Sequence, residues 1–184
     1  MLVLASASPR RQELLRNAGI EFVVHPANVR EIPRDGEAPH AFAERMAREK
    51  ALAVFAQRPN QLILGADTVV VTASEILGKP RDAADAARML RLLSGRKHEV
   101  ITGVCLAGPK LRIEKAQSET TLVIMSALSD DDIRSYVASG EPMDKAGAYA
   151  IQGMASRWIS RIEGDYFNVV GLPVALVWRM LKET

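Results

Sequence analysis

Residues 1–11 of the chain read MLVLASASPRR and join a short apolar stretch to the start of a helix. The apolar run 1–5 predicts a short buried strand. Ser8 can cap the helix that follows, because its side chain can accept a bond from a free backbone N–H group, and Pro9 suits the first helical turn. A strand that leads directly into a helix predicts an α/β protein.

The rest of the chain continues this alternation of strands and helices. Further strands are expected at 22–25, 61–72, 100–106 and 111–125, the last two as an antiparallel pair. Helices are expected at 40–57, from the Asp82 cap to Gly95, from the Ser129 and Asp132 capping box to Gly140, and after Leu172 and Pro173 near the carboxyl end. No repeat or linker interrupts residues 1–184. We therefore expect one α/β domain over residues 1–184, with a mixed central sheet flanked by helices and with division into two lobes left open.

Composition limits the classes of partner. The 184 residues are 48% apolar and 25% charged, which suits a compact fold with a sizeable core. Lys and Arg number 24 against 22 Asp and Glu, and 5% of residues are aromatic. A net charge of +2 with few aromatic side chains lacks the basic field and the stacking platforms of a nucleic-acid binder. Any anionic partner should therefore be small and bound locally.

Cysteine content and hydropathy indicate the compartment. Cys105 is the single cysteine, so an intramolecular disulfide and a multi-cysteine zinc site are excluded, and a reducing compartment is favoured. The amino terminus lacks a basic region before its apolar run, and no apolar stretch approaches about 18 residues. The sequence thus predicts a cytoplasmic protein that is neither secreted nor inserted in a membrane.

Arg10 and Arg11 stand in the first turn of the first predicted helix, where a cation opposes the positive end of the helix dipole. A polyphosphate would bind both guanidinium groups, the free N–H groups of that turn and the hydroxyls of Ser6 and Ser8. The alternative is that both arginines point into solvent. Neither G-x-x-x-x-G-K-[ST] nor G-x-G-x-x-G occurs here, so P-loop kinases and dinucleotide oxidoreductases lose their main support.

Asp67 interrupts the apolar run of the strand predicted at 61–72. A buried carboxylate without a partner is costly, so Asp67 is expected to bind a metal ion or to accept a proton. The alternative is an ordinary pairing with a nearby Arg or Lys, or the capping of a turn.

Two further side chains lie in segments rich in glycine or proline. Lys79 lies in the stiff turn Gly78-Lys79-Pro80, where the alternative is a solvated lysine. Gln152 ends a run of small residues over 144–153, which lets the backbone approach a flat ligand closely. Its amide can read the edge of a base, and the alternative is a loop amide bonded to the backbone.

Taken together, these segments resemble the Maf family of nucleotide pyrophosphatases. The matching strings follow the family order along nearly the whole chain and are SASPRR at 6–11, GADTV at 65–69, GKP at 78–80, SG at 94–95 with HEVITG at 98–103, DKAG at 144–147 through QG at 152–153, and GDY at 164–166 through Pro173. The resemblance implies an α/β fold related to inosine triphosphatases, with a nucleotide cleft between two lobes. It also implies metal-dependent cleavage of a nucleoside triphosphate to the monophosphate and pyrophosphate.

The resemblance also implies roles for individual residues. Asp67 matches the family's proton acceptor, and Mg²⁺ or Mn²⁺ would be held by Glu31 and Asp67. The residues that match the lining of the phosphate and metal site are Ser6, Arg10, Arg11, Glu31, Lys50 and Lys79. Arg10, Thr68 and Gln152 match positions linked to substrate choice, and the strings around Thr68 and Gln152 resemble the branch that acts on dTTP and UTP.

The expected activity is therefore hydrolysis of dTTP and UTP, with modified pyrimidine nucleotides as further candidates. Two alternatives stay open: a pyrophosphatase of the 7-methyl-GTP type, and a non-catalytic nucleotide-sensing regulator of cell division. A silent regulator would have lost its carboxylates, whereas Glu31 and Asp67 are both present. The expected partner is a nucleoside triphosphate, with no nucleic acid and no membrane, and homodimer formation is left open.

Overall fold

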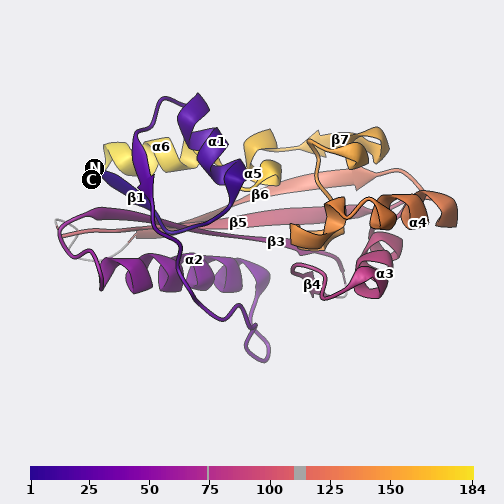
Figure 1. Ribbon diagram of the computed structural model, residues 1–184, viewed down its shortest axis with the longest axis horizontal. Coiled ribbons are helices and arrows are strands. Elements are labelled where there is room, and N and C mark those ends of the chain that lie inside the picture. The colour runs from indigo at the N-terminus through magenta and orange to yellow at the C-terminus, as the bar shows by residue number, and fades with distance from the viewer. Residues whose placement is uncertain (74, 110–114) are drawn as a thin grey trace. The chain divides into compact units, whose positions relative to one another are not determined.

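The computed structural model of the chain describes residues 1–73, 75–109 and 115–184. Its strands are β1 (Leu2–Leu4), β2 (Phe22–Val24), β3 (Leu62–Val71), β4 (Ile76–Leu77), β5 (Lys97–Ala107), β6 (Lys115–Met125) and β7 (Ile159–Glu163). Its α-helices are α1 (Pro9–Asn17), α2 (Pro39–Phe55), α3 (Ala83–Leu93), α4 (Asp130–Ala138), α5 (Tyr166–Val170) and α6 (Val174–Lys182), drawn in Figure 1. Three short 3₁₀ helices are η1 (Glu141–Asp144), η2 (Ala146–Ala148) and η3 (Met154–Trp158).

Strands of both directions form the sheet. Within the described ranges it has seven strands in the order β2-β1-β3-β5-β6-β7, and β4 pairs with β3. β1 is parallel to β2 and to β3, whereas β4 is antiparallel to β3 and β7 is antiparallel to β6. The expected α/β class with a mixed sheet and flanking helices is confirmed. The strand predicted at 111–125 is present from Lys115 onward, and the turn and strand residues predicted at 110–114 lie outside the described residues.

The chain divides into two compact units. The first contains Met1–Asp67, Thr102–Glu119 and Gly171–Thr184, and the second contains Thr68–Ile101 and Thr120–Val170. β3, β5 and β6 contribute residues to both units. Each unit is described by itself below.

In the first unit, α2 lies on one side of the strands, and α1 and α6 lie on the other (Figure 1). The apolar side chains between α2 and the strands are small: Val3, Ile63 and Cys105 of the strands pack with Ala47 and Val54 of α2. Small side chains let the helix axis approach the strands, because the interaxial distance depends on the side chains at the contact.

Two strand glycines bring the α2 backbone onto the sheet directly. A Cβ atom at Gly65 of β3 would overlap the carbonyl oxygen of Ala47 and lie 2.8 Å from the backbone nitrogen of Ala51. A Cβ atom at Gly103 of β5 would overlap the backbone of Ala43. Ala43, Ala47 and Ala51 are spaced four residues apart, so they form one face of α2. The contact between this alanine face and the two glycines sets the position of α2.

The second unit is built around α3, α4 and an aromatic core. The predicted caps are confirmed: Asp82 accepts from the backbone N–H of Asp85 at 2.8 Å, and Ser129 with Asp132 forms a reciprocal capping box. Tyr136 of α4 is fully buried, and its ring meets Trp158 edge-on at 5.3 Å between centroids. This contact joins α4 to the segment that precedes β7.

Sequence reasoning did not predict β4, α5 or β7. For β7, the reason is the spacing of its apolar residues. Its apolar residues, Ile159 and Ile162, are three positions apart rather than two. A bulge pairs Met125 with Ile159 and Ile124 with Arg161, so one residue of β7 is left over and the two isoleucines return to the same face. The bulge therefore removed the alternation by which a strand is recognised. The helix expected after Leu172 and Pro173 is confirmed as α6.

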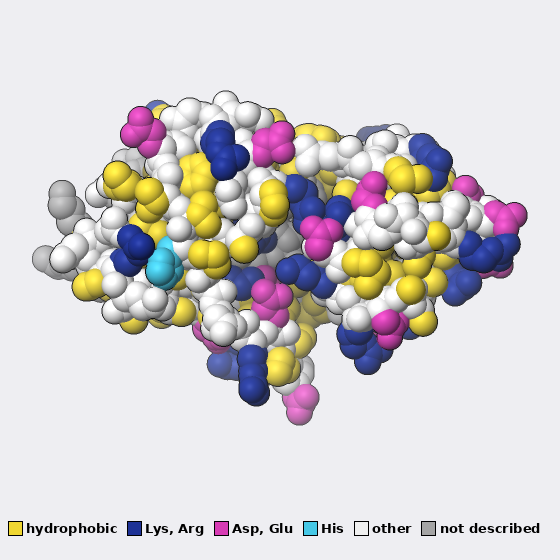
Figure 2. All heavy atoms as spheres, in the orientation of Figure 1, with side chains coloured by type: hydrophobic (Ala, Val, Ile, Leu, Met, Phe, Trp, Pro, Cys, Tyr) yellow, Lys and Arg dark blue, Asp and Glu magenta, His cyan; other side chains and the backbone are white. Residues whose placement is uncertain are grey.

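Charged side chains of both signs are interspersed on the face drawn in Figure 2. This agrees with the small net charge of +2. Among the helices of the described residues, none combines the length and the hydropathy needed to cross a bilayer.

We predict that Gly65→Ala destabilises the protein by about 1–3 kcal/mol, because the new methyl group must displace the α2 backbone rather than a flexible side chain. Urea unfolding of both proteins measures the difference. Gly78→Ala is the matched control, since a Cβ there meets no heavy atom of the described residues within 4 Å, and its effect should stay within about 0.5 kcal/mol. Equal effects of the two substitutions would contradict the tight contact between α2 and β3.

Candidate active site

Lys50, Asp67 and Glu31 form a charged cluster in the first unit. The Lys50 ammonium on α2 lies 2.5 Å from Asp67 Oδ1 on β3 and 2.6 Å from Glu31 Oε1 on the loop before α2. Lys50 and Asp67 are buried, with exposed fractions of 8% and 5%, while the Glu31 side chain is 42% exposed. One ammonium group therefore holds two carboxylates that are 36 residues apart in the chain.

Burial raises the pKa of the Asp67 carboxyl above its usual range. The nearby Glu31 charge raises that pKa further, whereas Lys50 and Arg11 act in the opposite direction. A buried carboxylate with a raised pKa is a better proton acceptor than an exposed one. The pairing of Asp67 with a lysine, which the sequence left as the alternative interpretation, is formed. This pairing is compatible with the expected role of Asp67 as a proton acceptor or metal ligand.

Arg11 is anchored inside the first unit instead of pointing into solvent. Its Nε donates to the carbonyl oxygen of Gly171 at 2.8 Å, and its Nη1 donates to Ser6 Oγ at 3.2 Å and to the carbonyl oxygen of Ala66 at 3.0 Å. Burial lowers the pKa of this guanidinium, while Asp67 and Glu31 raise it. The alternative of two solvated arginines is wrong for Arg11. Arg11 and Ser6 thus link the first turn of α1 to the strand that carries Asp67.

The amino end of α1 is ordered as the sequence predicts. Ser8 is its N-cap and accepts from the backbone N–H of Arg11 at 3.5 Å, while Ser6 Oγ accepts from the backbone N–H of Ser8 at 3.2 Å. Arg10 lies half-buried in the same turn and contributes to the lowered pKa of Arg11. Two arginines, a helix amino end and two hydroxyls therefore occur together, which is a donor set suited to phosphate oxygens.

The other three expected site residues belong to the second unit. Thr68 follows Asp67 in β3 and is half-buried. Lys79 follows β4 and is exposed. Gln152 is exposed in a turn between η2 and η3, and its amide makes no hydrogen bond to another of the described residues. The alternative of a loop amide bonded to backbone is therefore wrong within the described part of the chain.

Sequence reasoning missed Arg45, which anchors the loop that carries Glu31. Arg45 of α2 binds both carboxylate oxygens of Glu37 at 2.6 Å and donates to the carbonyl oxygen of Ile32 at 3.0 Å. These bonds hold the pKa of Glu37 at about 2, so the pair stays ionised over the working pH range. The Arg45 and Glu37 side chains are 16% and 10% exposed. No local pattern signals this pair, because one partner lies in a loop without regular structure.

The carboxylates of the cluster are of the kind that bind divalent cations. Carboxylate oxygens of Glu31 and Asp67 both lie within 2.6 Å of the Lys50 nitrogen, so the two carboxylates are near each other. Mg²⁺ is commonly bound by one or two carboxylates, with waters and substrate phosphates as its other ligands. Among the described residues, no group of three or more His, Cys, Asp or Glu forms an all-protein metal site. The donor set fits a cation that shares its ligands with a phosphate substrate.

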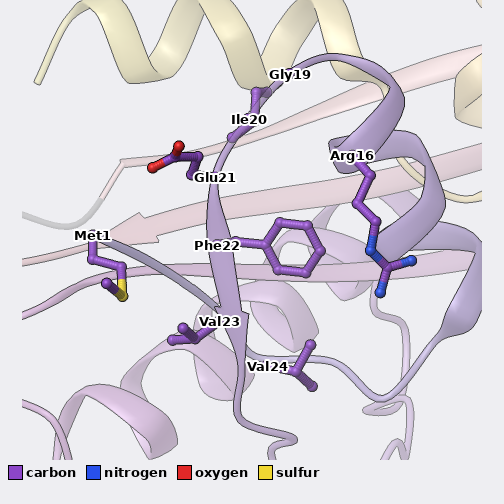
Figure 3. Close-up of a pocket in the computed structure, with 8 residues that line it drawn as sticks. All are labelled: Met1, Arg16, Gly19, Ile20, Glu21, Phe22, Val23 and Val24. Atoms are coloured by element: carbon purple, nitrogen blue, oxygen red, sulfur yellow. The ribbon is translucent and has the colours of Figure 1, made fainter.

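A surface hollow elsewhere in the first unit differs in character. It has a volume of about 670 Å³, runs along the edge strand β2, and is lined by Met1, Arg16 and residues 19–24 (Figure 3). The Arg16 guanidinium lies over the Phe22 ring, 5.7 Å from its centroid, and Val24 is partly exposed beside it. None of the expected site residues lines this hollow. It lacks the paired arginines and hydroxyls found at the start of α1.

Comparison with known proteins gives consistent matches along the whole chain. The family model described as "Maf-like protein" matches residues 1–184. A dTTP/UTP pyrophosphatase of Koribacter versatilis is 59% identical over 181 residues, which are 98% of this chain and 93% of the relative. A dTTP/UTP pyrophosphatase of Geobacter sulfurreducens is 53% identical over 181 residues, which are 98% of this chain and 95% of the relative.

The fold is also similar to that of a protein whose structure has been solved. The Ham1 protein of Staphylococcus aureus matches with a TM-score of 0.51, covering 99% of this chain and 98% of its own. The two sequences are 14% identical, so the similarity is one of fold alone.

We predict that Lys50→Met destabilises the protein by about 3 kcal/mol at pH 7, because it leaves Asp67 buried without its ammonium partner. Loss of Lys50 raises the folded-state pKa of Asp67 further above its unfolded value, so the folded state binds more protons and the defect shrinks as the pH falls. Urea midpoints at pH 7 and pH 5 measure this. The double variant Lys50→Met with Asp67→Asn should lose most of the pH dependence, and a defect of equal size at both pH values would contradict the pairing.

Proposed function

The chain belongs to the Maf-like protein family, and on that premise we propose that it is a pyrophosphatase that hydrolyses dTTP and UTP to the nucleoside monophosphate and pyrophosphate. The observation that carries the proposal is the buried Asp67, which forms an ion pair with Lys50. The same ammonium group binds Glu31, and Arg11 donates to the carbonyl oxygen of Ala66, the residue before Asp67. Relatives at 59% and 53% identity named dTTP/UTP pyrophosphatase support it. We propose the cytoplasm as its compartment, in keeping with one buried cysteine, Cys105.

Asp67 is the proposed proton acceptor. A water oxygen attacks the α-phosphorus. The anhydride bond between the α- and β-phosphates breaks, and pyrophosphate leaves with the electron pair of that bond. The water proton passes to an Asp67 carboxylate oxygen. An ordinary aspartate, with a pKa of about 4, is a weak base. Burial raises the pKa of Asp67, so its carboxylate accepts a proton more readily.

Cationic side chains neutralise charge on the phosphates. Arg10 and Arg11, with Ser6, stand at the amino end of α1, and we assign to them the binding of phosphate oxygens. Lys50 keeps Glu31 and Asp67 together, and Lys79 is proposed as a further phosphate contact from the turn after β4. Charge that develops on the leaving pyrophosphate would be stabilised by this set.

Glu31 and Asp67 are the residues that would hold Mg²⁺ or Mn²⁺. When bound, such a cation supplies positive charge at phosphate oxygens and lowers the pKa of water. In the protein, Arg45 and Glu37 keep the loop of Glu31 against α2, so that this carboxylate remains near Asp67. Loss of Arg45 would therefore weaken the site through Glu31.

Base preference is proposed to reside in Gln152, with Arg10 and Thr68. Thymine and uracil present an N–H donor between two carbonyl acceptors, and a glutamine amide offers both an acceptor and donors. Guanine presents two adjacent donors, which a carboxylate would satisfy better than an amide does. The exposed Gln152 amide is thus suited to pyrimidines.

The products test the reaction. Incubation with dTTP or UTP and Mg²⁺ or Mn²⁺ should release pyrophosphate and the nucleoside monophosphate in equal amounts, measured by chromatography with separate assays for pyrophosphate and orthophosphate. Release of orthophosphate with the diphosphate would contradict the proposal. Binding without turnover of any nucleoside triphosphate would instead favour the nucleotide-sensing regulator.

Asp67→Asn should lower kcat for dTTP by at least about a hundredfold, because the amide can neither accept the proton nor bind a cation well. The fold should persist, since asparagine has the same shape and can still accept from Lys50. Circular dichroism and nucleotide binding by calorimetry serve as controls. Wild-type turnover in this variant would move the chemistry away from Asp67.

Gln152→Glu should reduce or reverse the preference for pyrimidines, by several-fold to about a hundredfold, because one misplaced hydrogen-bonding group costs about 1–3 kcal/mol. The measurement is kcat/KM for dTTP, UTP, GTP and 7-methyl-GTP in the wild-type and variant proteins. An unchanged ratio would remove Gln152 from base recognition.

A further inference from the structure

We propose that Tyr136 and Glu141 are positioning residues that set the base preference by holding the turn around Gln152. The inference rests on the proposed function, in which Gln152 reads the base. Its basis is a set of hydrogen bonds within the second unit that link the backbone on both sides of Gln152 to one pair of side chains.

The turn itself is short and closed. The backbone N–H of Gly153 donates to the carbonyl oxygen of Ala150 at 3.1 Å, and Gln152 lies between them with its side chain exposed. A glutamine amide discriminates between base edges only if its position is defined, because its acceptor and donors must meet the correct groups. The hydrogen bond between Gly153 and Ala150 fixes the local bend of the turn. The orientation of the turn within the second unit must be set by other contacts.

Tyr136 and Glu141 supply those contacts. The Tyr136 hydroxyl accepts from the backbone N–H of Ala150 at 3.2 Å and donates to Glu141 Oε1 at 2.8 Å. The backbone N–H of Met154 donates to Glu141 Oε1 at 3.0 Å and to Oε2 at 3.2 Å. The residues two before and two after Gln152 are therefore bound to the same pair of side chains.

The pair is itself held by its surroundings. Tyr136 is fully buried and packs edge-on against Trp158. Glu141 directly follows Gly140, whose φ of 76° lets the chain reverse where α4 ends. Burial and the Glu141 carboxylate raise the pKa of Tyr136, so the phenol keeps the proton that it donates.

Close packing leaves the turn little freedom against this pair. A Cβ atom at Gly153 would overlap the Glu141 carboxylate, so the backbone of the turn lies directly against that side chain. Ala148, just before the turn, has a φ of 60°, a conformation that a residue other than glycine adopts rarely unless its surroundings hold it there. The segment that carries Gln152 is thus held by its neighbours in one conformation.

The test compares Tyr136→Phe and Glu141→Gln with Tyr149→Phe. Tyr149→Phe is the matched control, because it removes a phenolic oxygen from the same apolar core, where that oxygen lies 2.8 Å from His98 Nε2 and is not bonded to the Gln152 turn. UTP and GTP are the substrates, since they share ribose and triphosphate and differ in the base.

Tyr136→Phe and Glu141→Gln should each lower the ratio of kcat/KM for UTP over GTP by about fivefold to tenfold, mainly through a higher KM for UTP, as expected for the loss of about one hydrogen bond. Tyr149→Phe should leave the ratio unchanged. In a Gln152→Ala background, Tyr136→Phe should change the ratio no further, because the group that it positions is gone. A merely structural role would act equally in both backgrounds.

Amide exchange measured by NMR gives a readout that does not require activity. Exchange at the Ala150 and Met154 amides should accelerate in Tyr136→Phe and in Glu141→Gln, and not in Tyr149→Phe. If one variant fails to fold, the other carries the test. A wild-type protein that cleaves no nucleotide would refute the proposed function; an active protein without base preference, an unchanged ratio or an equal change in both backgrounds would overturn only the present inference.

Discussion

The contact between α2 and β3 is the constraint on which the proposed site depends. Gly65 and Asp67 are two residues apart in β3, so they lie on the same face of the strand. The missing side chain at Gly65 lets the backbone at Ala47 and Ala51 approach the strand. Lys50, in the same stretch of helix, then reaches Asp67 at 2.5 Å. A methyl group at Gly65 would therefore disturb the site as well as the core.

The electrostatics of this cluster indicate function more than stability. A buried ion pair contributes little net free energy of folding, because the desolvation of both groups offsets their attraction. Asp67 is nevertheless buried in an otherwise apolar strand, beside Lys50 and near Arg11 and Glu31. Burial and Glu31 raise its pKa, whereas Lys50 and Arg11 lower it. A raised pKa makes a carboxylate a stronger base, which agrees with the role of proton acceptor proposed for Asp67.

The two loops that carry Glu31 and Gln152 are held in a similar way. Each carries a side chain assigned to the reaction, Glu31 in one and Gln152 in the other, and neither loop has a regular hydrogen-bonding ladder. A side chain from a rigid helix binds the loop backbone in each case: Arg45 binds the carbonyl oxygen of Ile32, and Tyr136 binds the N–H group of Ala150. A carboxylate, Glu37 or Glu141, completes each anchor. Loops that must present a side chain precisely enough for recognition need such supports.

Local features could be predicted from the amino-acid sequence: the helix starts at Ser8 and at Ser129 with Asp132, the positions of most strands along the chain, and the unusual place of Asp67 in an apolar run. These depend on neighbours within about four residues, whose preferences are legible in the chain. The contact of Lys50 with Asp67 and the bulge that shifts the apolar period of β7 follow instead from the packing of distant segments. Lys50 was expected at the site only from the resemblance to a known family, because no pattern in its own helix indicates that role. Such contacts are set by which elements pack together, and partners far apart in the chain leave no local pattern from which to predict them.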